Sequence, residues 1–222
     1  MNIEKIVSLY DAQTKCYLAH KDASLVVDGD DKSPFIRAIK KKCDALDVKW
    51  LYPEDGLAHP VVVDLDVSYP DWLEEKRDID CIVNDGMSCC AEAVLSIIAV
   101  RDGGISGCNV CIIGRGHAVK GLADALLTNG ATVTICHSKT RDVMWHVISA
   151  DVVVLASPVM PNGYDGSANY KTIDVSGLLG DEVAVTASEV GKLNVSVLLN
   201  RLAKTPTLDA TPVVNGPLTL DE

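Results

Sequence analysis

An α/β fold of two lobes is predicted by this 222-residue sequence, and three observations predict it. From residue 107 onward, apolar β-branched runs alternate with amphipathic stretches, which is typical of a parallel sheet with right-handed crossovers. The run 109–113 is uninterrupted, as in a strand buried on both faces, and it leads into the turn G-R-G at 114–116. A glycine pair at 103–104 precedes this region and has the composition of a hinge. We therefore expect a C-terminal Rossmann-like parallel sheet joined to a smaller N-terminal α/β substrate lobe.

The elements of the first lobe follow from apolar periodicity. After a helix at the start of the chain, we expect a strand at 23–27 and a helix at 34–46. A second strand at 61–65 and an Ala/Leu/Ile-rich helix at 89–101 follow before the glycine pair.

We divide the chain into three parts on this basis. Residues 1–102 form the substrate lobe, 103–205 form a nucleotide-binding domain, and 206–222 form a C-terminal segment that returns to the first lobe. The sequence has no internal repeat and no low-complexity linker.

Charge and hydropathy exclude several classes of function. The net charge of −11 disfavours binding to a nucleic-acid backbone, which calls for a basic face. No apolar run approaches the roughly 20 residues that cross a bilayer, and the N-terminus carries acids where a signal peptide is basic and then apolar. We expect a cytoplasmic protein with no nucleic-acid or membrane partner.

The eight cysteines do not have the spacing of a metal site or a disulfide framework. Cys108 and Cys111 form a C-x-x-C, but residues three apart on a strand point to opposite faces. Cys89 and Cys90 are adjacent, and no second pair follows at the spacing of a zinc finger. Free buried thiols and no metal are the expectation.

The turn after strand 109–113 has the composition of a dinucleotide-binding loop. Glycines let the backbone approach a pyrophosphate, which the N–H groups of the following helix attract. The motif G-x-G-x-x-G is not intact, because its third glycine falls on Val119. An ordinary strand-turn-helix connection without a ligand is the alternative.

The next predicted strand, 131–136, indicates which dinucleotide would bind. An NAD site normally places an acid near this point to bond the ribose 2′-hydroxyl, but the sequence has His-Ser-Lys-Thr-Arg at 137–141. Cationic and hydroxyl donors suit a 2′-phosphate, so NADP is favoured over NAD. The alternative is that Lys139 and Arg141 simply begin a solvated helix.

These segments resemble a known family. The stretch GRGHAVKG at 114–121, then ATVTICHSKT at 131–140, then ADVVVLA at 150–156, is similar to the cofactor domain of the methylenetetrahydrofolate dehydrogenase/cyclohydrolase family, with its G-R-S-x-I-V-G, A-T-V-T-x-C-H-S-x-T and A-D-x-x-V-x-A motifs. KTIDVS at 171–176 and TPVVNGPLT at 211–219 are similar to later family segments. The resemblance implies NADP as cofactor and a homodimer. It also implies cofactor contacts at Gly114, Arg115, Gly116, His117, Ala118, Val119, His137, Ser138 and Thr140.

The first lobe departs from the family pattern. The family helix carries Y-V-x-x-K, a tyrosine against the pterin and a catalytic lysine, and alignment places Phe35 and Ile39 there. Lys40 is the candidate catalytic lysine only after a slip of one residue, which rotates a side chain by about 100 degrees on a helix. The alternative is that Ile39 is a core residue and the run 40–42 is a solvated face.

Other substrate-side candidates also come from the resemblance. VVVDLDVS at 61–68 replaces the family's I-L-V-Q-L-P-L-P, so Asp64 stands in place of a glutamine. RDIDCI at 77–82 is similar to K-D-V-D-G, which makes Asp80 the catalytic and pterin-holding carboxylate, with turn capping as the alternative. Pro217 in the closing motif is a further substrate-binding candidate.

The resemblance implies an NADP-dependent methylenetetrahydrofolate dehydrogenase-like oxidoreductase of one-carbon metabolism. Loss of the lysine would leave cyclohydrolase activity weak or absent, because that step needs proton transfer. Two alternatives stay open: an NADP-binding regulatory or scaffold protein without turnover, and an oxidoreductase retailored for another small substrate.

Overall fold

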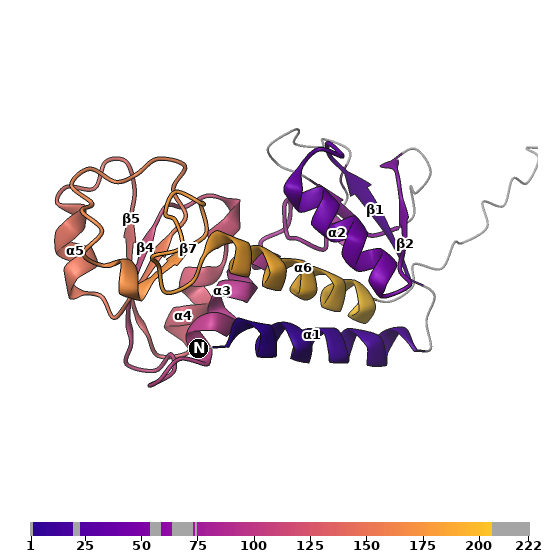
Figure 1. Cartoon of the computed structure of the whole chain (residues 1–222), viewed down its shortest axis with the longest axis horizontal. Coiled ribbons are helices and arrows are strands. Elements are labelled where there is room, and N and C mark those ends of the chain that lie inside the picture. The colour runs from indigo at the N-terminus through magenta and orange to yellow at the C-terminus, as the bar shows by residue number, and fades with distance from the viewer. Residues whose placement is uncertain (1, 20–22, 54–58, 64–72, 74, 206–222) are drawn as a thin grey trace, which may run out of the picture.

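The computed structural model has two α/β lobes joined by long helices (Figure 1). It describes residues 2–19, 23–53, 59–63, 73 and 75–205. Of the expected site residues, Asp64 and Pro217 lie outside this part of the chain.

The first lobe is built on a three-stranded parallel sheet in the order β2-β1-β3. Strand β1 (Ser24–Asp28) is central, and its apolar residues are buried because strands flank it on both sides. Strand β3 (Val61–Val63) begins where the sequence predicts it, whereas β2 (Lys49–Leu51) is three residues long and was not predicted. The carboxyl end of β1 is a switch point in the strand order, which is where open α/β sheets bind ligands.

Two helices of this lobe match the apolar pattern of the sequence. Helix α1 (Ile3–Leu18) begins at the cap Asn2, whose side chain accepts from the Lys5 backbone N–H. Helix α2 (Pro34–Ala45) has proline in its first turn and buries Ile36, Ile39 and Cys43 on one face.

Helix α3 (Cys89–Ala99) carries the chain from the first lobe to the second. Ser88 caps it by accepting from the Ala91 N–H, and most of its side chains are buried in the main core. At the predicted hinge, Gly103 and Gly104 both adopt positive φ, at 90° and 66°. This backbone is readily accessible only to glycine, so the sharp turn after α3 explains the pair.

The second lobe is a four-stranded parallel sheet in the order β5-β4-β6-β7, which confirms the predicted Rossmann-like architecture. Its strands are β4 (Asn109–Ile113), β5 (Thr132–Cys136), β6 (Val152–Leu155) and β7 (Thr172–Asp174). Its helices are α4 (Leu122–Thr128) and α5 (Val143–Ser149), with 3-10 turns at His117–Val119 and Asn169–Lys171. The chain passes from β5 back across β4 to β6, so the carboxyl end of β4 is a second switch point.

Helix α6 (Ala187–Lys204) joins the two lobes and lies beside α1 (Figure 1). A capping box between Thr186 and Glu189 starts it, and ten of its eighteen residues are buried. It packs on α1, α2 and α3 and also touches β7. The helix that returns to the first lobe therefore precedes segment 206–222, which we had expected to make this return and which lies outside the described residues.

One core cluster runs through both lobes, from Ile6 and Leu25 to Ile112 and Leu198. The boundary at 102/103 therefore separates the two sheets but does not separate two hydrophobic cores. The division into separate domains stays a prediction. Among the described residues, no helix is long and apolar enough to span a membrane.

Candidate functional site

The turn after β4 is held at the switch point by close backbone contacts with the ends of β5 and β6. The Gly114 N–H donates to the carbonyl of Cys136 at 2.8 Å, at the end of β5. Gly114 has φ +116°, and a Cβ there would lie 2.7 Å from the carbonyl carbon of Ala156, just beyond β6. Only glycine fits this path between the two neighbouring strand ends.

Gly116 is different, because a Cβ added there would meet nothing within 4 Å. The backbone at this point faces open space, which leaves room for a ligand to approach the turn. Ala118 and Val119 continue the chain into the 3-10 turn, where Val119 is buried. Arg115 is exposed beside the glycines.

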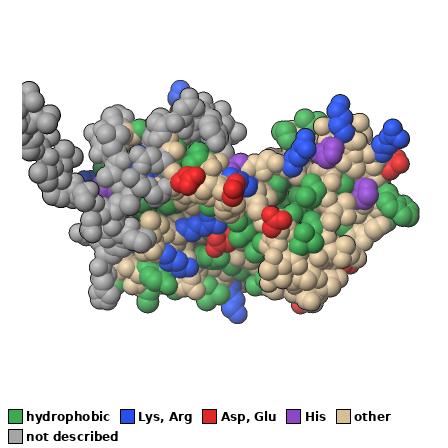
Figure 2. Space-filling view, turned by 180° about the vertical axis from the view of Figure 1, so that it is seen from behind, with side chains coloured by type: hydrophobic (Ala, Val, Ile, Leu, Met, Phe, Trp, Pro, Cys, Tyr) green, Lys and Arg blue, Asp and Glu red, His purple; other side chains and the backbone are tan. Residues whose placement is uncertain are grey.

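The carboxyl end of β5 adds polar donors at the same edge of the sheet. The segment 137–140 is folded into a tight turn: the Thr140 N–H donates to the His137 carbonyl, and the His137 N–H donates to Thr140 Oγ1 at 2.9 Å. Ser138, Lys139 and Arg141 are exposed. In Figure 2, basic and histidine side chains gather along the upper rim of the second lobe, on the right of the view.

Asp80 is the substrate-side candidate that the structure brings to residues 114–121, which we call the cofactor turn after their expected role. Its Oδ2 lies 3.2 Å from His117 Nε2, in the 3-10 turn after Gly116. Its Oδ1 accepts from the backbone N–H of Cys89 at 2.6 Å, at the N-terminus of α3. Both carboxylate oxygens are therefore engaged, and the side chain is 9% exposed. Each oxygen keeps a further acceptor position, but the low exposure of the side chain leaves little of it open to a substrate group.

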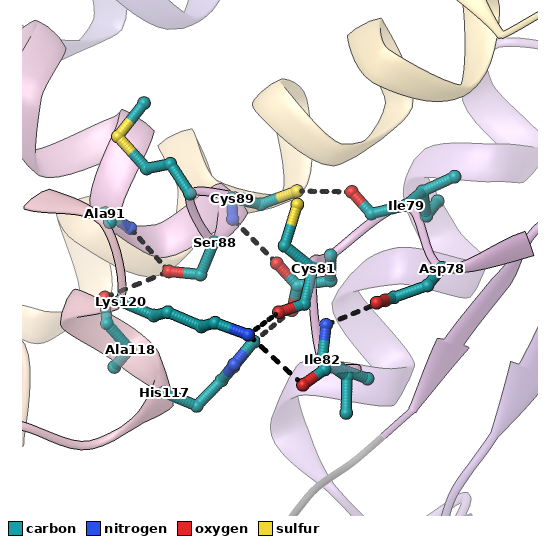
Figure 3. A network of polar contacts seen from close by, with 12 residues as sticks. Asp78, Ile79, Cys81, Ile82, Ser88, Cys89, Ala91, His117, Ala118 and Lys120 are labelled. Atoms are coloured by element: carbon teal, nitrogen blue, oxygen red, sulfur yellow. Dashed lines mark hydrogen bonds and ion pairs between the residues drawn. The ribbon is translucent and has the colours of Figure 1, made fainter. Parts of the chain in front are cut away.

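The loop 78–88 that carries Asp80 is organised by a second carboxylate. Asp78 accepts from the backbone N–H groups of Ile82, Val83 and Asn84 at 2.8 to 3.2 Å. From the cofactor turn, Lys120 Nζ donates to carbonyls of the same loop, including Cys81 and Ile82 (Figure 3).

A half-buried polar cluster connects the other side of this loop to the long helices. Arg201 of α6 donates to Glu92 Oε2 of α3 through Nε at 2.8 Å, and to the carbonyls of Ile79 and Met87. Tyr10 of α1 donates to Glu92 Oε1 at 3.2 Å, and burial raises its pKa. A cavity of about 440 Å³ lies between the loop and the end of α6, lined by Asp78, Ile79, Cys81, Met87, Arg201, Lys204 and Thr205.

The cysteines at this junction are not activated nucleophiles. Burial, and then the nearby Asp80 carboxylate, raise the pKa of the Cys89 thiol well above its usual range. The same two causes raise the pKa of Cys90 to about 12. Because the thiolate is the nucleophile, these cysteines cannot supply one near neutral pH.

Lys40 lies away from the Asp80 contacts. Its Nζ pairs with Asp31 at 2.6 Å and stands over the rings of Trp50 and Tyr52, at 4.1 and 4.6 Å from their centroids. Ile39 is fully buried in the core, and Phe35 packs against the same core. The described structure thus gives Lys40 a partner within its own lobe and offers no cation at the position of the family lysine.

Several residues of this junction were not singled out from the sequence: Lys120, Asp78, Glu92, Arg201 and Tyr10. Only Lys120 carried a sequence signal, since it stands where the G-R-S-x-I-V-G motif ends in glycine. The others are contacts between segments far apart in the chain, which periodicity does not reveal.

Comparison with known proteins finds the same likeness over part of the chain. Residues 88–161 match the model of the tetrahydrofolate dehydrogenase/cyclohydrolase NAD(P)-binding domain. The bifunctional protein FolD of Paraburkholderia xenovorans is 40% identical over 108 residues, which are 47% of this chain and 35% of that protein. FolD of Caldanaerobacter subterraneus is 28% identical over 170 residues, which are 68% of this chain and 60% of that protein. The chain thus spans between about a third and three fifths of these curated relatives.

Solved structures extend the likeness of fold to both lobes. The bifunctional 5,10-methylenetetrahydrofolate dehydrogenase/cyclohydrolase of Thermoplasma acidophilum superposes with a TM-score of 0.68 at 17% identity, over 91% of this chain and 96% of that one. FolD of Campylobacter jejuni gives 0.67 at 18% identity, over 91% and 95%. Residues 88–161 of this chain are thus similar to the NAD(P)-binding domain of the tetrahydrofolate dehydrogenase/cyclohydrolase family, and both lobes share the fold of enzymes with that name.

Proposed function

We propose that this protein is an NADP-dependent methylenetetrahydrofolate dehydrogenase-like oxidoreductase in which cyclohydrolase activity is weak or lost. The observation that carries the proposal is the cofactor edge: a glycine turn at the switch point, with exposed cations and hydroxyls on the neighbouring strand end.

The residues at this edge fit a dinucleotide with a 2′-phosphate. The open space at Gly116 allows close approach of a pyrophosphate, and Arg115, Ser138 and Lys139 supply charged and neutral donors. No carboxylate stands between residues 131 and 141, where an NAD site would place one. Bound NADP would accept a hydride, while the protein aligns the two reacting rings and excludes water. Among the structural relatives, the Trypanosoma brucei enzyme was solved with NADP, whereas the Saccharomyces cerevisiae enzyme is NAD-dependent.

The substrate side supports the loss of cyclohydrolysis. That reaction needs a positioned proton-transfer group, whose removal typically costs about 10²- to 10⁴-fold in rate. Ile39 is buried at the position of the family lysine, and the neighbouring candidate Lys40 is paired with Asp31. Hydride transfer to a cofactor depends less on such a group.

A second candidate function has an observation in its favour. His117 and Cys89 each contact one oxygen of Asp80 and the side chain is 9% exposed, so little of the carboxylate is open for the pterin-holding role that the resemblance implies. An NADP-binding protein without folate turnover, or one that acts on another small substrate, is consistent with that geometry.

Turnover of 5,10-methylenetetrahydrofolate with NADP and with NAD, followed as reduced nicotinamide and methenyl product, separates these candidates. A rate with NADP supports the dehydrogenase, and NADP binding without turnover supports the second candidate. Absence of NADP binding would contradict both.

The choice of cofactor is tested by Arg115→Ala. A charge-assisted hydrogen bond is worth about 1.5–3 kcal/mol, so the affinity for NADP should fall roughly 10- to 100-fold while that for NAD changes little. Arg101→Ala is the control, because this arginine precedes β4 and contacts the Asp151 carbonyl. Equal losses of NADP and NAD affinity in Arg115→Ala would rule out the 2′-phosphate role.

The same proposal includes a cytoplasmic homodimer, as the resemblance implies. Light scattering on the purified chain measures the dimer directly, and a monomeric mass would contradict it.

A further inference from the structure

Two segments from different lobes are fastened to each other beside the cofactor turn. We call residues 78–88 the Asp80 loop and residues 117–121 the turn end. The His117–Asp80 contact joins them at 3.2 Å. The Ser88 N–H donates to the carbonyl of Lys120 at 3.1 Å, and Ser88 Oγ donates to the carbonyl of Ala118 at 3.3 Å. Both segments therefore contribute side-chain and backbone groups to the connection.

Lys120 makes three of the hydrogen bonds that connect the two segments. Its Nζ donates to the carbonyls of Cys81 at 2.8 Å and Ile82 at 3.3 Å (Figure 3). It also donates to the carbonyl of Asn84. One cation thus bridges three carbonyls within four residues of the Asp80 loop, and hydrogen bonds from a charged donor are stronger than neutral ones. The family motif G-R-S-x-I-V-G has glycine at this position, which has no side chain to make these bonds.

The backbones of the two segments also touch directly. Gly121 has φ +78°, and a Cβ there would lie 2.7 Å from Met87 Cα. The turn end cannot shift toward the loop at this point, because the backbones are already in close contact. A movement of the turn should therefore be transmitted to the Asp80 loop.

We propose that Lys120 and His117 are positioning residues that couple dinucleotide binding at the cofactor turn to the order of the Asp80 loop. The inference rests on the proposed function only in requiring that NADP binds at residues 114–116. A ligand that restrains the turn end then stabilises the loop, and the loop in turn raises the affinity for that ligand by the same factor. Cofactor binding would thereby stabilise the loop that carries Asp80.

Hydrogen–deuterium exchange of the full chain, with and without NADP, tests the coupling without requiring turnover. The reporters are the amides of Ile82, Val83 and Cys89, which donate to the carboxylates of Asp78 and Asp80. NADP should slow their exchange by about five- to tenfold, the lower range of typical coupling between sites. In Lys120→Met the added protection should disappear, and NADP affinity should fall by a similar factor.

Two further variants control for a general loss of stability. Lys192→Met removes an exposed lysine that pairs with Glu4 and not with the Asp80 loop, and it should keep the added protection. Lys120→Arg keeps a cation with several donors and should retain most of it. If Lys120→Met does not fold, His117→Asn provides the milder test and should lose part of the protection.

The outcomes separate this inference from the proposed function. Added protection in the wild type that Lys120→Met abolishes supports the coupling. NADP binding that leaves the loop amides unchanged, or protection that persists in Lys120→Met and His117→Asn, overturns the coupling and leaves the proposed function standing. A wild-type protein that does not bind NADP overturns both.

Discussion

Replacing Arg201 with methionine should remove the polar contacts that connect α6 to the Asp80 loop and to α3. The guanidinium donates to Glu92 Oε2 through two nitrogens, at 2.8 and 2.5 Å, and to the carbonyls of Ile79, Met87 and Ser88 at 2.7 to 3.4 Å. Methionine preserves most of the apolar stem but none of the donors, so the loss reports the polar contacts.

The magnitude follows from the burial of the pair. Breaking a fully buried ion pair costs about 3–5 kcal/mol because one charge is left without a partner, whereas an exposed pair is worth about 0–1 kcal/mol. The Arg201 and Glu92 side chains are 21% and 25% exposed, so water relieves part of the penalty. We expect a loss of about 3 kcal/mol in the free energy of unfolding, or roughly 6–12 °C in Tm for a chain of this size.

Urea unfolding followed by circular dichroism measures this loss, and Arg101→Met is the matched control. Arg101 makes only two contacts of 3.4 Å to the Asp151 carbonyl, so its replacement should cost less than about 1 kcal/mol. A double-mutant cycle with Glu92→Gln should give a coupling energy of about 1–2 kcal/mol. A loss in Arg201→Met as small as in the control would refute the idea that this cluster holds α6 in place.

Two other predictions concern the cofactor turn and the buried thiols. Gly114→Ala should abolish NADP binding and lower the free energy of unfolding by at least about 1–2 kcal/mol, because alanine is strained at φ +116° and overlaps the Ala156 carbonyl. Calorimetric titration measures the binding, and urea unfolding measures the stability. Unchanged NADP binding would contradict the prediction. Burial raises the pKa of Cys43 to about 12, so it stays protonated in the native state, while the unfolded thiol ionises above a pH of about 8.5. Stability should therefore fall as pH rises from 8 to 10 under reducing conditions, by about 2 kcal/mol from this residue, and Cys43→Ala should lose that much less in the same urea melts. Equal losses in the two proteins would argue against the shifted pKa.

The sequence predicts correctly those elements in which the spacing of apolar residues and glycines matches their burial and backbone path in the structure. Helix α2 was predicted at 34–46 and lies at 34–45, because its proline start and its apolar spacing both match burial on one face. The glycine turn after β4 was recognised because the strand, the glycines and the following helix are contiguous. Strand β2 was missed because three residues are too few to show a period of two.

The site was less accessible to sequence reasoning because its contacts are between distant segments. Asp80 and His117 were each named, one as a substrate residue and the other as a cofactor residue, yet nothing in the sequence indicated that they meet. The sequence offers Lys40 as a catalytic amine, but in the structure it pairs with Asp31 and stands over the ring of Trp50. The roles assigned to Asp64 and Pro217 stay predictions.

The pairing of α1 with α6 has a consequence for how this chain acquires its structure during synthesis. Asn200 of α6 donates to Thr14 Oγ1 and to the Tyr10 carbonyl of α1, and Lys192 pairs with Glu4, so these partners are separated by more than 180 residues. Helix α1 leaves the ribosome long before α6, so the face that packs on α6 stays uncovered while the residues between them are synthesised. Contacts of such long range slow folding, and they leave α1 open to chaperones and proteases until α6 has emerged.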